Sequence, residues 1–134
     1  MEGRALTARR TISSGGHWEP IYGYSRAVVV GDACYVAGTS DAGPDGKARH
    51  PGDPAGQARG ILEVIERALE EAGFSLGDVV RTRIYITAAA DADAIGAVHG
   101  EFFRDVRPAS AMIVMVGLVD PSLLVEIEVD AVRG

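Results

Sequence analysis

The sequence predicts an α+β fold, in which a mixed β-sheet carries two helices on one face. Two long segments repeat apolar residues with helical spacing, and several shorter segments alternate apolar and polar residues as half-buried strands do. These segments follow one another in the order β-β-β-α-β-α-β-β. The 134 residues fit one domain, residues 1–134, that is large enough to bury its own core.

The N-terminal part of the chain contains three short predicted strands. "RRTISSG" predicts the first strand, which runs into the glycine-broken loop "GGHWEPIYGY". "RAVVVGDACYVAGT" then predicts two strands joined by a turn at Gly31–Asp32. The next segment, "SDAGPDGKARHPGD", is rich in Gly, Pro and Asp and predicts a loop.

Two helices are predicted after this loop. The first begins at Asp53–Pro54, an N-cap followed by proline at the first helical position, and ends at Gly73. Its apolar residues form one stripe: Ile61, Leu62, Ile65, Ala68, Leu69 and Ala72. The second helix spans roughly residues 91–104 and is predicted to bury Ile95, Val98, Phe102 and Phe103.

The strands of the C-terminal half carry rows of charge. "DVVRTRIYIT" alternates, with Arg81 and Arg83 on the side opposite its apolar residues. The last strand, "LLVEIEVDAV", places Glu126, Glu128 and Asp130 on one face. We expect these acids to pair with the arginines across strands. The alternative for any one acid is a carboxylate at the rim of a cleft that orients a water molecule.

The strand predicted for "SAMIVMVGL" is apolar on both faces. Every residue from Met112 to Val116 is apolar, yet the two helices can cover only one face of the sheet. Large exposed apolar patches are rare on soluble monomers, so we expect a second copy of the chain to cover this strand. The alternative is that the strand is buried within one chain.

Composition excludes several classes of function. The net charge is −6, with 13 basic against 19 acidic residues, so no positive footprint for nucleic acid is expected. The single cysteine, Cys34, fits a reducing cytosol and a buried hydrophobic position. No segment resembles a signal peptide or a membrane span, which predicts a soluble cytoplasmic protein. His17, His50 and His99 lack metal spacing, and no nucleotide fingerprint is present, so neither metal nor cofactor is expected.

One loop, "HWEPIYGYSR", gathers aromatic and charged residues just before a predicted strand. Trp18 is either a plug for the core or part of a binding site. Arg26, a long cation close to Tyr24 in the sequence, could bind a small carboxylate.

The chain resembles the RidA/YjgF family, also called endoribonuclease L-PSP-like. The resemblance is carried by "GYSRAVVVGDACYVAGT", "QARGILEVIERALEEAGFSLGDVVRTRIYIT", "HGEFFRDVRPAS" and "LLVEIEVDAV". It implies a chorismate-mutase-like subunit that assembles as a homotrimer, with three clefts between subunits. It also implies hydrolysis of small enamines or imines to keto compounds and ammonia.

The resemblance also implies roles for individual residues. Tyr24 matches the family's cleft tyrosine, Gly38 matches the residue whose N–H contacts the ligand, and Glu126 matches the glutamate that positions water. Ser110 stands where the family has a carboxylate-binding arginine, and a serine has no charge for that purpose. Met112 replaces the family's cysteine on the same strand.

Two hypotheses address the missing arginine. Arg26 could supply the guanidinium from another strand, or the ligand could lack a carboxylate and occupy a more apolar pocket of Trp18, Tyr24 and Met112. His99 is a possible proton carrier, although such a residue is more often structural. The sequence therefore predicts a small-molecule hydrolase, with a non-catalytic ligand-binding trimer as the alternative and ribonuclease activity ranked last.

Overall fold

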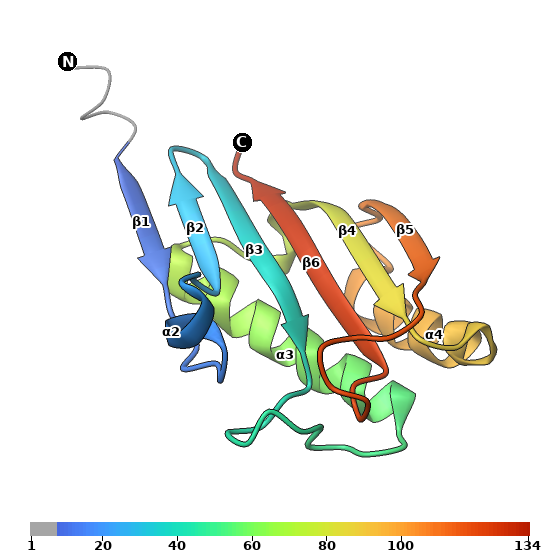
Figure 1. The fold of residues 1–134 in the computed structure, drawn as a ribbon. Coiled ribbons are helices and arrows are strands. Elements are labelled where there is room, and N and C mark those ends of the chain that lie inside the picture. Colours follow the sequence, from blue (N-terminus) through green and yellow to red (C-terminus); the bar gives the residue numbers. More distant parts are fainter. Residues whose placement is uncertain (1–7) are drawn as a thin grey trace.

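The computed structural model describes residues 8–134 and confirms the α+β class (Figure 1). A mixed sheet has the strand order β1-β2-β3-β6-β4-β5. Its strands are β1 (Arg9–Ile12), β2 (Ala27–Val30), β3 (Ala33–Ser40), β4 (Val79–Ile86), β5 (Ala109–Val114) and β6 (Val125–Val132). The pairs are antiparallel except for β4 and β5, which run parallel and place β5 at one edge.

The two long helices, α3 (Pro54–Ala72) and α4 (Ala92–Phe103), pack on the same face of the sheet (Figure 1). The Asp53 side chain accepts a hydrogen bond from the Gly56 N–H at 2.9 Å, and Gly73 ends α3 with φ 88°. Both predicted ends of α3 are therefore confirmed: Asp53 accepts from a backbone N–H of the first turn, and the Gly73 N–H donates to backbone carbonyls of the last turn. The short 3₁₀ helices η1 (Leu76–Asp78) and η2 (Ala89–Asp91) lead into β4 and α4.

The segment predicted as a loop before β2 contains a short helix, α2 (Glu19–Tyr22). Pro20 lies in its first turn, and Gly23 ends it in the left-handed conformation with φ 76°. The loop prediction was wrong here because a four-residue helix is too short to show a repeating apolar pattern.

The core lies between the sheet and the two long helices. The stripe predicted for α3 is buried in full, and Ile95, Val98 and Phe103 of α4 are buried beside it. Phe102 is only partly buried against this core. Cys34 is fully buried, and burial raises the pKa of its thiol, as suits a core residue.

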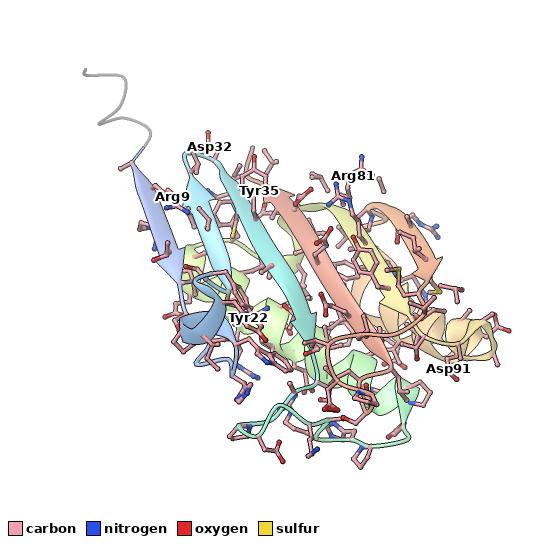
Figure 2. All side chains as sticks on the ribbon, in the orientation of Figure 1. Arg9, Tyr22, Asp32, Tyr35, Arg81 and Asp91 are labelled. Carbon is pink, nitrogen blue, oxygen red and sulfur yellow. The ribbon has the colours of Figure 1, made fainter. Side chains whose placement is uncertain are left out.

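The charged residues of β6 alternate with its buried apolar residues and so lie on the face of the sheet opposite the helices; Figure 2 labels Arg81 of the neighbouring strand β4. Arg83 pairs with Glu128 at 3.3 Å and with Asp130 at 3.4 Å, and the Tyr85 hydroxyl donates to Glu128 at 3.0 Å. Arg81 of β4 lies directly opposite Asp130 of β6 in the sheet, but Asp130 forms its ion pair with Arg83. The cross-strand pairing is confirmed for Arg83.

Strand β5 is exposed along its whole length. Ile113 is 41% exposed and Val114 is 56% exposed, and the apolar residues Met115 and Val116 continue the surface beyond the strand. The alternative that this strand is buried within one chain is therefore wrong. No helix within residues 8–134 has the length and apolar character needed to cross a bilayer.

One buried side chain joins α3 to the two loops beneath the sheet. The Gln57 amide donates to the carbonyls of His50 and Ser122, both at 3.0 Å, and its oxygen accepts from the Leu124 N–H at 2.9 Å. Gln57 is fully buried, and its amide makes hydrogen bonds to backbone groups of both loops.

We expect Gln57→Leu to lower the free energy of unfolding by about 2 kcal/mol, because three hydrogen bonds between the buried Gln57 amide and the backbone are lost. Chemical denaturation measures the change. Glu63→Leu, on the exposed side of the same helix, is the control and should have little effect. Equal stability of the two variants would contradict the role assigned to Gln57.

Candidate functional site

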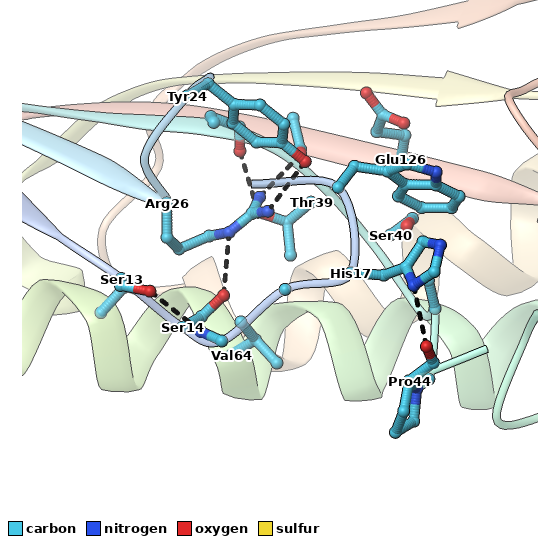
Figure 3. Close-up of a pocket in the computed structure, with 18 of the residues that line it drawn as sticks. Ser13, Ser14, His17, Tyr24, Arg26, Thr39, Ser40, Pro44, Val64 and Glu126 are labelled. Atoms are coloured by element: carbon cyan, nitrogen blue, oxygen red, sulfur yellow. Dashed lines mark hydrogen bonds between the residues drawn. The ribbon is translucent and has the colours of Figure 1, made fainter. Parts of the chain in front are cut away.

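A cavity of about 840 Å³ lies between the loop that precedes β2, the end of β3 and helix α3 (Figure 3). Five of the predicted site residues line it: Trp18, Tyr24, Arg26, Gly38 and Glu126. They come from segments that are far apart in the chain, and the sheet brings β3 and β6 together as neighbours. The fold therefore gathers most of the predicted site in one place.

Gly38 lies in a bulge of β3, next to the side chain of Glu126 on β6. The register between β3 and β6 shifts between Val36 and Thr39, so Gly38 lies in the irregular part of the ladder. A Cβ atom at position 38 would overlap the Glu126 carboxylate. Only glycine therefore allows this carboxylate to lie directly against the β3 backbone.

Glu126 is half-buried at this position. Burial raises the pKa of its carboxyl, the positive charge of Arg26 lowers it, and the negative charge of Glu128 raises it again, for a net increase. A carboxylate with a raised pKa is a stronger base, so Glu126 is better suited to accept a proton from water near neutral pH.

Arg26 is a hydrogen-bonding centre of the cavity wall, and its side chain is nearly inaccessible to solvent. Its Nη1 donates to the Gly38 carbonyl at 2.7 Å and to Thr39 Oγ1 at 2.8 Å, and its Nε donates to Ser14 Oγ at 3.2 Å. Its Nη2 donates to the Tyr24 hydroxyl at 3.5 Å (Figure 3). These contacts use four of the five N–H groups of a guanidinium, so a two-point carboxylate clamp would have to displace one of them.

Glu19 holds the loop in front of Arg26. It accepts hydrogen bonds from Ser14 Oγ at 2.6 Å, from Ser13 Oγ at 3.0 Å and from the Gly16 N–H at 3.1 Å, and it lies 3.5 Å from Arg26 Nε. Burial raises the pKa of Glu19, but these hydrogen bonds and Arg26 lower it overall. A fully bonded carboxylate with a lowered pKa fits a structural role rather than proton transfer.

The other three predicted site residues lie elsewhere, at the edge of the sheet that faces α4. Thr82 Oγ1 donates to Ser110 Oγ at 2.8 Å and lies 2.9 Å from His99 Nε2. Met112 lies two residues after Ser110 in β5. It is close to α4, since a Cβ atom at Gly96 would lie 3.9 Å from Met112 Cε. Burial lowers the pKa of His99, which favours the neutral imidazole in this row. Within one chain the predicted site is thus divided into two groups.

Two arginines line the cavity that the sequence pattern did not single out, Arg49 and Arg67. Arg49 belongs to the long loop before α3, and Arg67 belongs to α3 itself. Nothing in a loop of mixed composition shows which side chain will face a cavity, and Arg67 falls in the charged part of an amphipathic helix. Among residues 8–134 no cluster of three or more His, Cys, Asp or Glu side chains could hold a metal ion.

Comparison with known proteins identifies the class to which this fold and cavity belong. The family model for Endoribonuclease L-PSP matches residues 16–133, and the chain belongs to this family. It is 39% identical over 108 residues to the 3-aminoacrylate deaminase RutC of Acinetobacter baylyi, covering 81% of this chain and 85% of RutC.

Solved structures agree with this assignment. The crystal structure of Rv2704 from Mycobacterium tuberculosis, of the YjgF/YER057c/UK114 family, is 44% identical and superposes with a TM-score of 0.85, covering 94% of this chain and all of that one. The YjgF gene product of E. coli is 28% identical, with a TM-score of 0.80 and coverage of 93% and 99%. The resemblance to the RidA/YjgF family seen in the sequence is confirmed.

The raised pKa of Glu126 predicts a pH dependence of stability. The folded protein holds this proton at pH values where the unfolded chain, with a pKa near 4.5, has lost it. The contribution to stability is therefore present below pH 4.5 and is lost as the pH rises through the folded-state pKa. Glu126→Gln cannot ionise, so its melting temperature should rise relative to the wild type between acidic and neutral pH.

Thermal unfolding over a range of pH tests this, with Glu63→Gln on the exposed side of α3, outside the cavity, as the control. Wild-type and Glu126→Gln curves that stay parallel over the whole range would contradict it.

Proposed function

We propose that this protein hydrolyses small enamines or imines to keto compounds and ammonia. The observation that carries the proposal is the Glu126 carboxylate, with a raised pKa, held against the backbone of Gly38 in a cavity. The deaminase activity named for the RutC relative supports the same class of reaction.

Glu126 would act as the base. Its carboxylate accepts a proton from water as the water oxygen bonds to the imine carbon, and the electron pair of the C=N bond moves to nitrogen. The protonated Glu126 returns the proton to nitrogen. Glu126 then takes the hydroxyl proton of the resulting carbinolamine and passes it to nitrogen, so that the C–N bond breaks, ammonia leaves and the carbonyl forms. Imines hydrolyse unaided, so the protein must lower the barrier by only about a few kcal/mol.

The surrounding groups would fix the reacting atoms. Arg26 holds the Gly38 carbonyl at 2.7 Å and so keeps the bulged backbone of β3 beside the carboxylate. Its buried positive charge also lowers the pKa of Glu126, which favours the ionised form that can accept a proton. The Tyr24 ring lies 5.6 Å from the Arg26 guanidinium and forms another part of the wall.

The complete site would form between subunits of a homotrimer. The exposed apolar surface of β5 supports association, because such a surface is costly in water. Association through this edge would bring His99, Ser110 and Met112 of one copy toward the cavity of another. The division of the predicted site into two groups within one chain is the reason for this proposal.

A second candidate is a trimer that binds a small molecule without catalysis. It is favoured by the uncharged Ser110 and by the nearly saturated Arg26, since together they leave neither residue as a ready carboxylate clamp. Ribonuclease activity, despite the description of the family, ranks last because the net charge of −6 does not favour phosphate backbones.

Keto-acid release from 2-iminobutanoate generated in situ tests the hydrolase. We expect the wild type to accelerate release over buffer and Glu126→Gln to lose about 100-fold or more of that acceleration, because its amide cannot accept the proton. Glu63→Gln, on the exposed side of α3 and outside the cavity, is the matched control and should retain activity. A wild type without acceleration would instead favour the binding trimer.

Sedimentation velocity tests the assembly. The wild type should sediment as a trimer, and Val114→Glu should dissociate it, because a charge is placed on the exposed apolar edge strand. Ala97→Glu, on the exposed side of α4, is the control and should leave the trimer intact. A stable wild-type monomer at micromolar concentration would remove the proposed inter-subunit site.

A further inference from the structure

The cavity is lined by three arginines, and they differ in what their guanidinium groups already bind. Arg26 is 5% exposed, and its donors are directed at Gly38, Thr39, Ser14 and Tyr24. Arg67 is on the exposed side of α3, and no hydrogen bond or ion pair fixes it within residues 8–134. Arg49 alone among the three is both anchored and accessible.

A buried carboxylate anchors Arg49. Asp41 is fully buried, and its Oδ1 lies 3.2 Å from Arg49 Nε and 3.1 Å from Arg49 Nη2. The backbone reinforces this pair, because the Arg49 N–H donates to the Asp41 carbonyl at 2.9 Å. The Arg49 side chain is 43% exposed, so the pair fixes its Nε–Nη2 edge while the rest of the guanidinium remains open to solvent.

Helix α3 has a glycine where it passes the Arg49–Asp41 ion pair. Gly60 of α3 faces the pair, and a Cβ atom there would lie 2.8 Å from both Arg49 Nη2 and Asp41 Oδ1. Any larger residue at position 60 would push the guanidinium or its anchor away. On the loop side, Gly43 packs close to the Arg49 side chain, where a Cβ would be 3.4 Å from Cγ.

From this geometry we infer that Arg49 is the anion-binding residue of the cavity and holds the carboxylate of the ligand. Its Nη1 makes no hydrogen bond within residues 8–134, so this group can donate to a carboxylate oxygen while Asp41 keeps the other edge in place. Arg49 would thus supply, from the loop before α3, the charge that Ser110 lacks. The choice of a keto or imino acid as ligand rests on the proposed function.

The test is calorimetric binding of 2-oxobutanoate and of its neutral methyl ester to the full chain. Arg49→Gln removes the charge but keeps an amide N–H for Asp41, which still accepts from the His50 N–H at 2.7 Å and lies 3.0 Å from its Nδ1. We expect about tenfold or more weaker binding of the acid and unchanged binding of the ester.

Arg59→Gln is the matched control. Arg59 is 45% exposed, close to the 43% of Arg49, and pairs with Glu101 outside the cavity, so the variant makes the same change in net charge. Gly60→Ala is a second variant that keeps the cation but displaces it, and it should also weaken binding of the acid. Melting temperatures of all variants show whether each one is folded.

The inference is overturned if Arg49→Gln binds the acid as the wild type does, if both glutamine variants weaken binding equally, or if the wild type binds acid and ester alike. The hydrolase proposal fails separately, when imine hydrolysis is not accelerated. Binding of the acid that depends on Arg49 without any acceleration would leave Arg49 as the anion site of a non-catalytic protein.

Discussion

The contact between Arg26 and the Gly38 carbonyl joins the two halves of the cavity wall. Arg26 is buried at the start of β2, and its guanidinium reaches across to the bulged part of β3 at 2.7 Å. Ser14 Oγ accepts a hydrogen bond from the same guanidinium, which fixes the loop that closes the cavity on the other side. Without this buried cation, the Gly38 carbonyl would lose this donor in a poorly solvated place, and the Ser14 hydroxyl would keep only its hydrogen bond to Glu19.

The charged groups of the cavity differ in how many of their hydrogen-bonding atoms already have a partner. Arg26 is a structural cation because its donors are occupied, and Glu126 remains available because no donor within residues 8–134 saturates it. Arg49 differs from Arg26, because Asp41 binds one edge of its guanidinium and the other edge is open to solvent. In the proposed reaction, a carboxylate ligand would approach a base and a cation that form no ion pair with each other within residues 8–134.

The exposed edge strand imposes the second constraint. Among residues 8–134, β5 pairs with one strand, β4, and the pairing is parallel. Exposed apolar side chains follow one another along β5, and Ser110 of the same strand is linked through Thr82 of β4 to His99 of α4. A site built from the cavity and this edge requires contact between copies, so in the proposed trimer stability and function depend on the same surface.

The sequence alone determined the class of fold, because helical and strand periodicities are local properties. The ends of α3 followed from Asp53, Pro54 and Gly73, whose preferences act within one turn of helix. The exposure of a two-sided apolar strand also followed, since two helices cannot cover both faces of a sheet. Family resemblance added Glu126 and Gly38, which the structure places in contact.

Only the tertiary structure decided which donors of each arginine are already occupied. Arg26 and Arg49 look alike in the sequence, as single cations in irregular segments. The fold places the Gly38 carbonyl and the Thr39 hydroxyl next to Arg26, and both accept hydrogen bonds from it. It places Gly60 of α3, which has no side chain, next to Arg49. Whether a guanidinium is free depends on partners distant in the chain, and no local pattern encodes them.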